Sequence, residues 1–195
     1  MGLRMEAQQP LKSLAKGHSS APAETAVELV HLFDKLLAVR AFALDVDGVL
    51  TDNFVHLTES GEQLRRMNIR DGLGIRIALE NGFPFCVITG GRSQGVIKRL
   101  SLLGIEHIYS GISDKWPVLM QFLEQFQLRS ADVCYIGDDL PDLEVLRRVG
   151  LAACPADAVA EVRAVADYVS PFAGGSGCVR DVIEKVLKSQ DKWRF

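Results

Sequence analysis

Two aspartates separated by one residue stand at the end of a short apolar run. The run Ala41–Asp45 is typical of a buried strand, and it continues into the tetrad Asp-Val-Asp-Gly at 45–48. Side chains two residues apart in a strand point to the same face, so Asp45 and Asp47 would lie on the same side of the strand. Carboxylates that meet at a strand's end repel unless a cation lies between them, and a hard divalent ion such as Mg²⁺ prefers oxygen ligands. Alone, the tetrad fits a metal site and an Asx-rich turn equally well.

Further polar residues follow other apolar runs. Thr89 ends the run 83–89, Lys115 comes shortly after the run 105–109, and Asp138 follows the run 133–136 within the segment GDDLPD. In parallel α/β sheets, ligands collect at the carboxyl ends of the strands. Because the polar clusters all fall at such ends, the sequence favours an active site over an isolated turn.

These residue types suit phosphoryl transfer. The carboxylates of Asp45, Asp47 and Asp138 could hold Mg²⁺ together with water and substrate oxygens, while Thr89 and Lys115 are donors for an anion. A carboxylate can act as a nucleophile through an aspartyl-phosphate, and Mg²⁺ and a lysine then neutralise charge on the transferred group. The second carboxylate of the pair could protonate the leaving oxygen and later deprotonate water.

The intervening segments predict strands that alternate with helices. Such alternation indicates βαβ units, a mainly parallel sheet and right-handed crossovers. Two short runs around the Gly61 turn, 54–57 and 63–69, predict a hairpin. We expect an α/β fold, a Rossmann-like three-layer sandwich with a mainly parallel central sheet and a small β-hairpin in place of a cap domain. The predicted helices are 22–39, 73–81, 93–103, 113–127, a segment ending at 149, 157–166 and 179–187, and the remaining predicted strands are 151–154 and 168–169.

The length of 195 residues fits one domain. Residues 1–22 are polar and lack periodicity, so we expect a flexible N-terminal arm followed by a single domain over 23–195. Within that domain the hairpin would occupy about 53–70 and a C-terminal tail about 171–195. The run Gly174–Gly177 (GGSG) fits a mobile tail or a plain linker.

Composition gives no reason to expect nucleic acid or a membrane as partner. The formal net charge is −3, no apolar run approaches the roughly 20 residues that span a bilayer, and the N-terminus has no signal-peptide core. The cysteines lie far apart, without a CxxC pair, so we expect reduced core residues and a cytoplasmic protein. They are Cys86, Cys134, Cys154 and Cys178.

The order of the motifs resembles the haloacid dehalogenase superfamily. Between about Arg40 and Leu187 the match narrows, and the chain resembles the 3-deoxy-D-manno-octulosonate 8-phosphate phosphatases. The segments that carry the resemblance are 45–52 (DVDGVLTD), 68–74 (NIRDGLG), 137–142 (GDDLPD), 166–169 (ADYV) and 174–181 (GGSGCVRD). The resemblance implies Mg²⁺-dependent hydrolysis of that phosphorylated sugar acid through an aspartyl-phosphate, in lipopolysaccharide biosynthesis of a Gram-negative bacterium.

The resemblance also implies roles for the carboxylates. Asp45 would be the nucleophile and a Mg²⁺ ligand, and Asp47 would be the general acid and base that also binds the metal through its backbone carbonyl. Asp138 would be the third protein ligand. Asp139 and Asp142 would orient Lys115 or the metal's waters, although Asp142 equally fits an ordinary acid in the first turn of a helix.

The remaining implied roles concern the substrate. Thr89 would bind the phosphoryl group, and Lys115 would bind both that group and Asp45. An arginine fork suits a substrate carboxylate, and Asp71 could also cap the helix that follows it. The implied substrate-binding residues are Asp47, Asn68, Ile69, Arg70, Asp71, Gly72, Arg76, Gly90, Arg92, Arg99 and Lys115.

One position departs from the family pattern. The family usually reads Thr-Gly-Arg after the second strand, whereas this chain has Gly91 in place of that arginine and Arg92 next to it. Arg92 could supply the missing cation, or the substrate could differ.

Other functions compete with this interpretation. They are a phosphatase of a nine-carbon sialic-type sugar acid 9-phosphate, a non-catalytic tetramerisation module, and a receiver-type phosphoacceptor, which would have no use for Asp47 as a leaving-group acid. Without a cap domain the site would be open to water unless a neighbouring subunit covered it. Members of the resembling family are homotetramers whose C-terminal tails reach an adjacent site, so we expect a homotetramer here.

Overall fold

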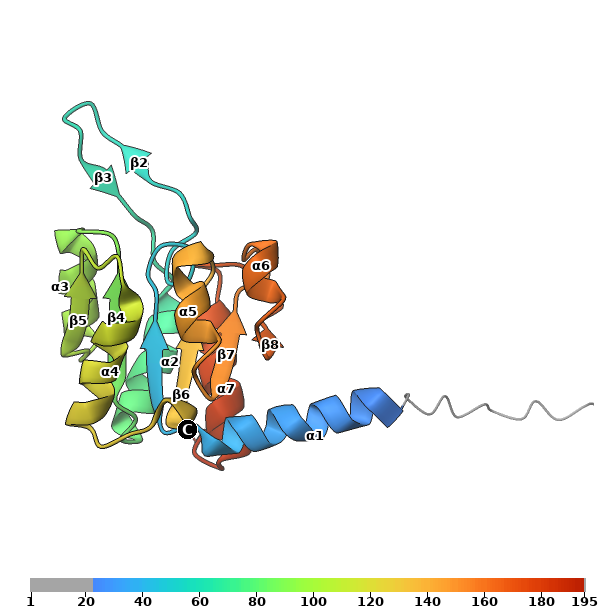
Figure 1. Ribbon diagram of the computed structural model, residues 1–195. Helices are drawn as coiled ribbons and strands as arrows, with labels where there is room; N and C mark the ends of the chain where they lie inside the picture. Colours follow the sequence, from blue (N-terminus) through green and yellow to red (C-terminus); the bar gives the residue numbers. More distant parts are fainter. Residues whose placement is uncertain (1–22, 195) are drawn as a thin grey trace, which may run out of the picture.

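The computed structural model describes residues 23–194, with side chains from residue 31 onward. The predicted arm at 1–22 lies outside the described residues. A six-stranded parallel sheet has the order β5-β4-β1-β6-β7-β8, and a separate two-stranded antiparallel sheet stands beyond its carboxyl edge (Figure 1). The strands of the main sheet are β1 Ala41–Leu44, β4 Phe85–Thr89, β5 His107–Ser110, β6 Val133–Ile136, β7 Leu151–Cys154 and β8 Tyr168–Val169. The predicted α/β sandwich is confirmed.

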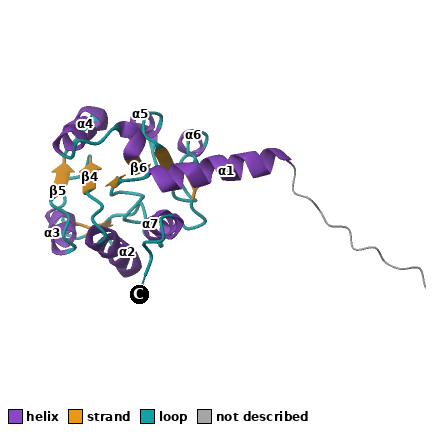
Figure 2. Ribbon diagram, turned by 90° about the horizontal axis from the view of Figure 1, so that it is seen from below, coloured by secondary structure: helices purple, strands orange, loops and turns teal. Residues whose placement is uncertain are grey.

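Helices cover both faces of this sheet (Figure 2). One layer holds α2 Ile69–Glu80, α3 Gln94–Leu102 and α7 Cys178–Ser189, and the other holds α4 Lys115–Gln125, α5 Leu143–Leu146 and α6 Ala160–Arg163. The central strand β1 shows why both faces of the sheet need a helical layer. Phe42 and Leu44 pack in one apolar core, while Ala41 and Ala43 pack in the other. A strand buried on both faces reads as a continuous apolar run, which is the pattern seen in the sequence.

The position of β1 determines where polar side chains meet. It pairs with β4 on one side and with β6 on the other. The order of the strands reverses at this point, so the carboxyl ends of β1, β4 and β6 border one crevice. The first helix, α1 Ala23–Ala38, leads into β1 and extends away from the body of the protein at the opposite edge (Figure 1). No helix in the described part of the chain is both long and apolar enough to cross a membrane.

The hairpin and the helix after it differ from the prediction. The strands of the hairpin are shorter than predicted, β2 His56–Leu57 and β3 Gln63–Leu64. The helix α2 begins at Ile69 rather than at Leu73. The Asn68 side chain accepts a hydrogen bond from the Arg70 N–H at 2.8 Å and so caps the helix. This cap starts the helix inside the segment that was expected to continue the strand. The helices α5 and α6 are also shorter than predicted.

Two glycines of the loop 174–177, for which we expected a mobile tail or a plain linker, pack closely against the loop after β1. A Cβ on Gly174 would lie 2.0 Å from the Gly48 carbonyl oxygen, and a Cβ on Gly175 would lie 2.7 Å from the Asp52 nitrogen. The Gly175 N–H donates to the Val49 carbonyl at 3.0 Å. These glycines allow the chain to approach the loop after β1. The helix that follows, α7, packs against α2 with six buried side chains.

Candidate active site

The carboxyl ends of three strands open into one cavity of about 460 Å³. Asp45 and Asp47 come from the end of β1, Thr89 from the end of β4, Lys115 from the first turn of α4, and Asp138 from the residues after β6. The structure therefore brings all the predicted catalytic residues and metal ligands together. The complete lining is Asp45, Asp47, Asn53, Thr89, Gly90, Gly91, Ile112, Ser113, Lys115, Asp138, Asp139 and Pro141.

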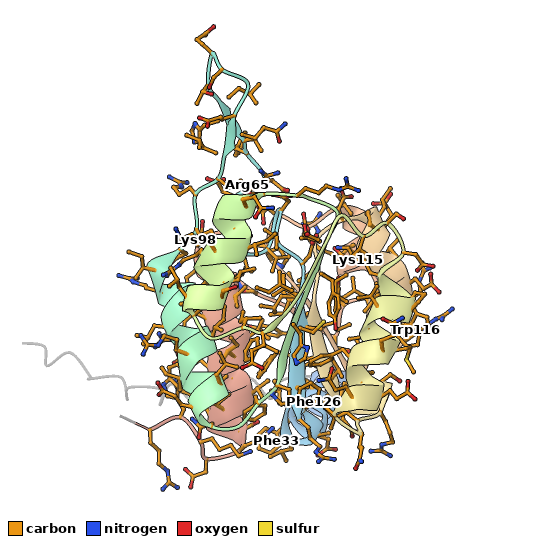
Figure 3. All side chains as sticks on the ribbon, turned by 90° about the vertical axis from the view of Figure 1, so that its left-hand side faces the viewer. Phe33, Arg65, Lys98, Lys115, Trp116 and Phe126 are labelled. Carbon is orange, nitrogen blue, oxygen red and sulfur yellow. The ribbon has the colours of Figure 1, made fainter. Side chains whose placement is uncertain are left out.

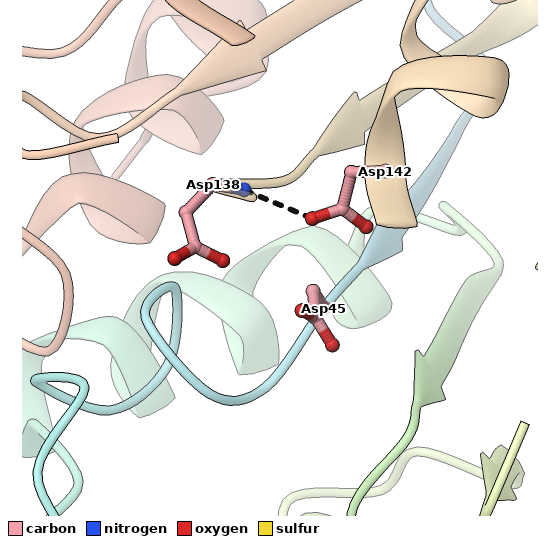
Figure 4. Close-up of side chains that lie close together, drawn as sticks. All are labelled: Asp45, Asp138 and Asp142. Carbon is pink, nitrogen blue, oxygen red and sulfur yellow. Dashed lines mark hydrogen bonds between the residues drawn. The ribbon is translucent and has the colours of Figure 1, made fainter. Parts of the chain in front are cut away.

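Three buried aspartates lie closest together in this region. Oxygens of Asp45, Asp138 and Asp142 all lie within 4.8 Å of one another (Figure 4). Asp142, however, already uses both of its oxygens. Oδ1 accepts from the Lys115 ammonium at 2.7 Å and from the Tyr135 hydroxyl at 2.6 Å, and Oδ2 accepts from the Asp138 N–H at 3.0 Å. Asp142 therefore holds its neighbours in place, which favours the orienting role over an ordinary first-turn acid.

Asp138 Oδ1 is buried without a hydrogen-bond donor among the described residues, and the donor group next to Asp45 Oδ1 is the Lys115 ammonium at 3.0 Å. Burial raises the pKa of the Asp45 carboxyl to about 7, with the charge of Asp142 adding to the shift. Burial likewise raises the pKa of Asp138 to about 6. One ammonium does not neutralise three buried aspartates that lie this close together, and Asp138 Oδ1 has no donor in the described part of the chain, so a bound cation would offset the cost of burying them. An all-oxygen donor set suits Mg²⁺. The residues present therefore fit a divalent metal ion.

Lys115 supplies the fixed positive charge of the site. Its side chain is almost completely buried, with Nζ 3.0 Å from Asp45 Oδ1 in an ion pair. Burial alone would lower the pKa of Lys115, but the charges of Asp45 and Asp142 outweigh it and raise the pKa. The ammonium is therefore charged and held at the carboxyl end of the sheet, where it is labelled in Figure 3.

Thr89 and Gly90 complete the wall on the β4 side. The Thr89 side chain is buried, and its Oγ1 accepts from the Gly91 N–H at 3.1 Å. The hydroxyl hydrogen remains available to donate into the cavity. Together with the Lys115 ammonium, this gives donors for an anion bound next to Asp45.

Comparisons with known proteins support the same interpretation. Residues 100–181 match the model of a haloacid dehalogenase-like hydrolase family. The 3-deoxy-D-manno-octulosonate 8-phosphate phosphatase KdsC of Salmonella typhi is 41% identical over 162 residues, which cover 83% of this chain and 86% of that protein. KdsC of Escherichia coli K12 is 42% identical over 79% of this chain and 82% of its own length.

The chain belongs to the KdsC family.

Solved structures of this family superpose closely on the fold. KdsC from Yersinia pestis has a TM-score of 0.81 at 38% identity and covers 83% of this chain and 88% of its own. KdsC from Moraxella catarrhalis, determined with magnesium, phosphate and KDO bound, has a TM-score of 0.81 at 34% identity and covers 83% and 93% of the two chains.

Most of the predicted sugar-binding residues lie outside the KdsC-like cavity. Arg70, Arg76 and Ile69 are exposed on α2, and Asn68 caps that helix. Asp71 is 1% exposed and accepts from the Arg180 N–H at 2.7 Å, so it caps α7 rather than its own helix. The predicted substrate-binding residues outside the lining of the cavity, among those described, are Asn68, Ile69, Arg70, Asp71, Gly72, Arg76, Arg92 and Arg99.

Arg92 does not turn toward the cavity. It is exposed, and its guanidinium lies beside Gly111, where a Cβ would be 2.5 Å from Arg92 Nε. The expectation that Arg92 supplies the missing cation is therefore not met in this structure.

Three residues of the site were missed from sequence. Asn53 donates to Asp138 Oδ2 at 2.9 Å, Tyr135 binds Asp142, and Arg65 Nε donates to Asp47 Oδ1 at 2.6 Å. A tyrosine inside a buried apolar strand needs a partner for its hydroxyl, so Tyr135 carried a signal. Asn53 and Arg65 reach the site only through the folding of the loop and the hairpin, which no local pattern indicates.

Proposed function

We propose that this chain is a Mg²⁺-dependent phosphatase that hydrolyses 3-deoxy-D-manno-octulosonate 8-phosphate to 3-deoxy-D-manno-octulosonate and phosphate, in lipopolysaccharide biosynthesis. The observation that carries the proposal is the cluster of the buried Asp45 and Asp138 carboxylates, in which Asp45 pairs with the Lys115 ammonium and Asp138 keeps an oxygen without a donor from the described residues. Membership of the KdsC family, and the magnesium, phosphate and KDO bound to the Moraxella catarrhalis protein, support the choice of metal and substrate.

In this mechanism Asp45 attacks phosphorus and the bond to the sugar oxygen breaks. Asp47 gives a proton to the leaving oxygen, and the sugar acid departs from the aspartyl-phosphate. Water then attacks phosphorus, Asp47 takes its proton, and the bond to Asp45 breaks to release phosphate. Both carboxylates return to their starting states.

The remaining residues stabilise charge during these steps. Thr89 and Lys115 would donate to the phosphoryl oxygens, and Asp142 holds the lysine in place. Asp45, Asp138 and the Asp47 carbonyl would hold Mg²⁺, which when bound neutralises charge on the transferred group and favours the ionised form of Asp45.

We further propose a homotetramer built from single domains spanning 23–195. Large apolar side chains are exposed on the hairpin, including Phe54 at 72% and Leu57 at 71%, and such patches mark protein–protein contacts. Arg70 and Arg76 are exposed outside the cavity of their own chain, so a second subunit is needed for them to contribute to a sugar site. The four cysteines are free and buried, which supports a cytoplasmic location.

The test is phosphate release from a panel of sugar-acid phosphates, with and without Mg²⁺, by the wild type and by Asp45→Asn. We expect Mg²⁺-dependent release from the eight-carbon substrate and none from the variant. A preference for a nine-carbon sialic-type 9-phosphate would overturn the substrate assignment. No release from any substrate would favour the non-catalytic module.

A further inference from the structure

Arg65 makes the closest polar contact to Asp47 among the described residues, although Asp47 and Arg65 belong to different parts of the fold. Nε lies 2.6 Å from Asp47 Oδ1 and Nη2 lies 3.4 Å from Oδ2, so both oxygens are held by one guanidinium fork. The Arg65 side chain is 11% exposed, whereas Asp47 is 38% exposed at the rim of the cavity. Figure 3 shows Arg65 where the hairpin joins the body of the protein.

Gly91 leaves the space that this pair occupies. A Cβ at position 91 would lie 3.0 Å from Asp47 Oδ2 and 3.8 Å from Arg65 Nη2. Gly91 is not among the described residues with a positive φ, so the backbone conformation there does not require glycine. Its lack of a side chain matters because the Asp47 carboxylate approaches so closely.

We propose that Arg65 is the positioning residue of Asp47. By binding both carboxylate oxygens it fixes the orientation from which Asp47 exchanges protons with the leaving group and with water. The inference rests on the proposed function, in which Asp47 is the acid and base. An exposed carboxylate without the fork would sample other rotamers, and small misplacements of a reacting group are costly in rate.

Arg66 provides a matched control. It follows Arg65 in the chain, is 73% exposed, and pairs with Asp52 at 2.6 Å, outside the lining of the cavity. Both arginines therefore connect the end of the hairpin to the loop after β1, but only Arg65 touches a residue of the reaction.

The experiment compares Arg65→Met, Arg65→Lys and Arg66→Met with the wild type on 3-deoxy-D-manno-octulosonate 8-phosphate, with thermal unfolding as a check on folding. For Arg65→Met we expect kcat to fall by about 10- to 100-fold with KM within about threefold. Arg65→Lys should recover part of the loss, since it keeps a donor but not the fork. Arg66→Met should stay within about twofold of the wild type in both constants.

A second measurement separates positioning from a purely structural effect. An aryl phosphate has a leaving group that needs no proton, so Arg65→Met should form the aspartyl-phosphate at nearly the normal rate and hydrolyse it slowly. The expected signature is a rapid burst of the released phenol, with an amplitude equal to the enzyme concentration, followed by slow turnover. Three outcomes would overturn the role of Arg65 and leave the proposed function standing. They are a loss confined to KM, equal losses of activity in Arg65→Met and Arg66→Met, and the absence of a burst. A wild type inactive on every substrate would overturn the proposed function, and this inference with it.

Discussion

Lys115 Nζ donates to Asp142 Oδ1 at 2.7 Å, deep in a site where Asp142 has no exposed surface. Every other partner of the Asp142 carboxylate is also a donor: the Tyr135 hydroxyl and the N–H groups of Asp138 and Asp139. An ionised carboxylate can satisfy all of them. An amide cannot, because one of its termini is itself a donor.

We therefore predict that Asp142→Asn is damaging. The amide group would face a donor and leave the Lys115 ammonium with one carboxylate instead of two. The expected loss in the free energy of unfolding is about 2–4 kcal/mol, with a large fall in kcat. Chemical denaturation and steady-state kinetics measure the two effects.

Asp139→Asn is the matched control. The Asp139 carboxylate accepts from the Leu140 N–H at 2.7 Å at the start of a short helical turn, and asparagine caps such turns equally well. A change below about 0.5 kcal/mol is expected. Equal destabilisation by the two variants would contradict the role given to Asp142.

Metal binding should depend on pH. Burial raises the pKa of Asp45 to about 7 and of Asp138 to about 6, so both carboxyls hold protons that compete with a cation at low pH. After EDTA treatment, added Mg²⁺ should raise the melting temperature clearly at pH 8 and little at pH 5.5. Asp138→Asn should lose most of the shift at pH 8. The same Mg²⁺ shift at both pH values would argue against these ligands.

Asp71 gives a second pH effect, away from the metal site. Burial raises its pKa from 3.8 to about 6, and one of its oxygens has no donor. The folded protein keeps a proton that the unfolded chain releases, so this group favours folding below about pH 4, and the advantage is lost as pH rises through about 6. Asp71→Asn cannot ionise. Between pH 5 and pH 8 the unfolding free energy of Asp71→Asn should therefore increase relative to that of the wild type by about 1.4 kcal/mol.

Urea unfolding of both proteins at the two pH values, with Mg²⁺ present throughout, measures this difference. Asp45 and Asp138 are present in both proteins, so their contribution cancels in the difference between wild type and variant. A gap between wild type and variant that stays constant with pH would show that Asp71 ionises normally.

Gly174→Ala should disturb the loop after β1, which carries Asp47. The new Cβ would lie 2.0 Å from the Gly48 carbonyl oxygen, so the loop that follows β1 or the loop 174–177 must shift. We expect a loss of at least about 2 kcal/mol in stability and a reduced kcat. Gly95→Ala is the control, because Gly95 lies in α3 with its nearest atom 3.9 Å away, and alanine favours helices. Similar behaviour of the two variants would exclude a steric cause.

Much of the fold and the centre of the site could be predicted from the sequence, for one physical reason. Parallel strands place their carboxyl ends at one edge, so Asp45, Thr89 and Asp138 had to approach each other once the strands were recognised. The apolar runs of those strands are continuous because both faces are buried, which made them easy to find.

Other features depend on contacts that local patterns do not encode. The start of α2 was misplaced because Asn68 ends the extended segment by capping the helix, although apolar residues continue on both sides. Asp71 caps a helix more than 100 residues away in the chain, as its bond to the Arg180 N–H shows. Arg65 meets Asp47 only because the hairpin returns the chain to the mouth of the cavity.

The packing of Gly174 against Gly48 joins residues that are far apart in the chain. The loop that carries Asp47 is synthesised well before the segment 174–177 that packs against it. A partly synthesised chain that already contains Asp45, Thr89, Lys115 and Asp138 still lacks this support. The site is therefore completed only after residues 174–177 have been made, and a chain that stopped before Gly174 would lack this support while keeping every predicted catalytic residue.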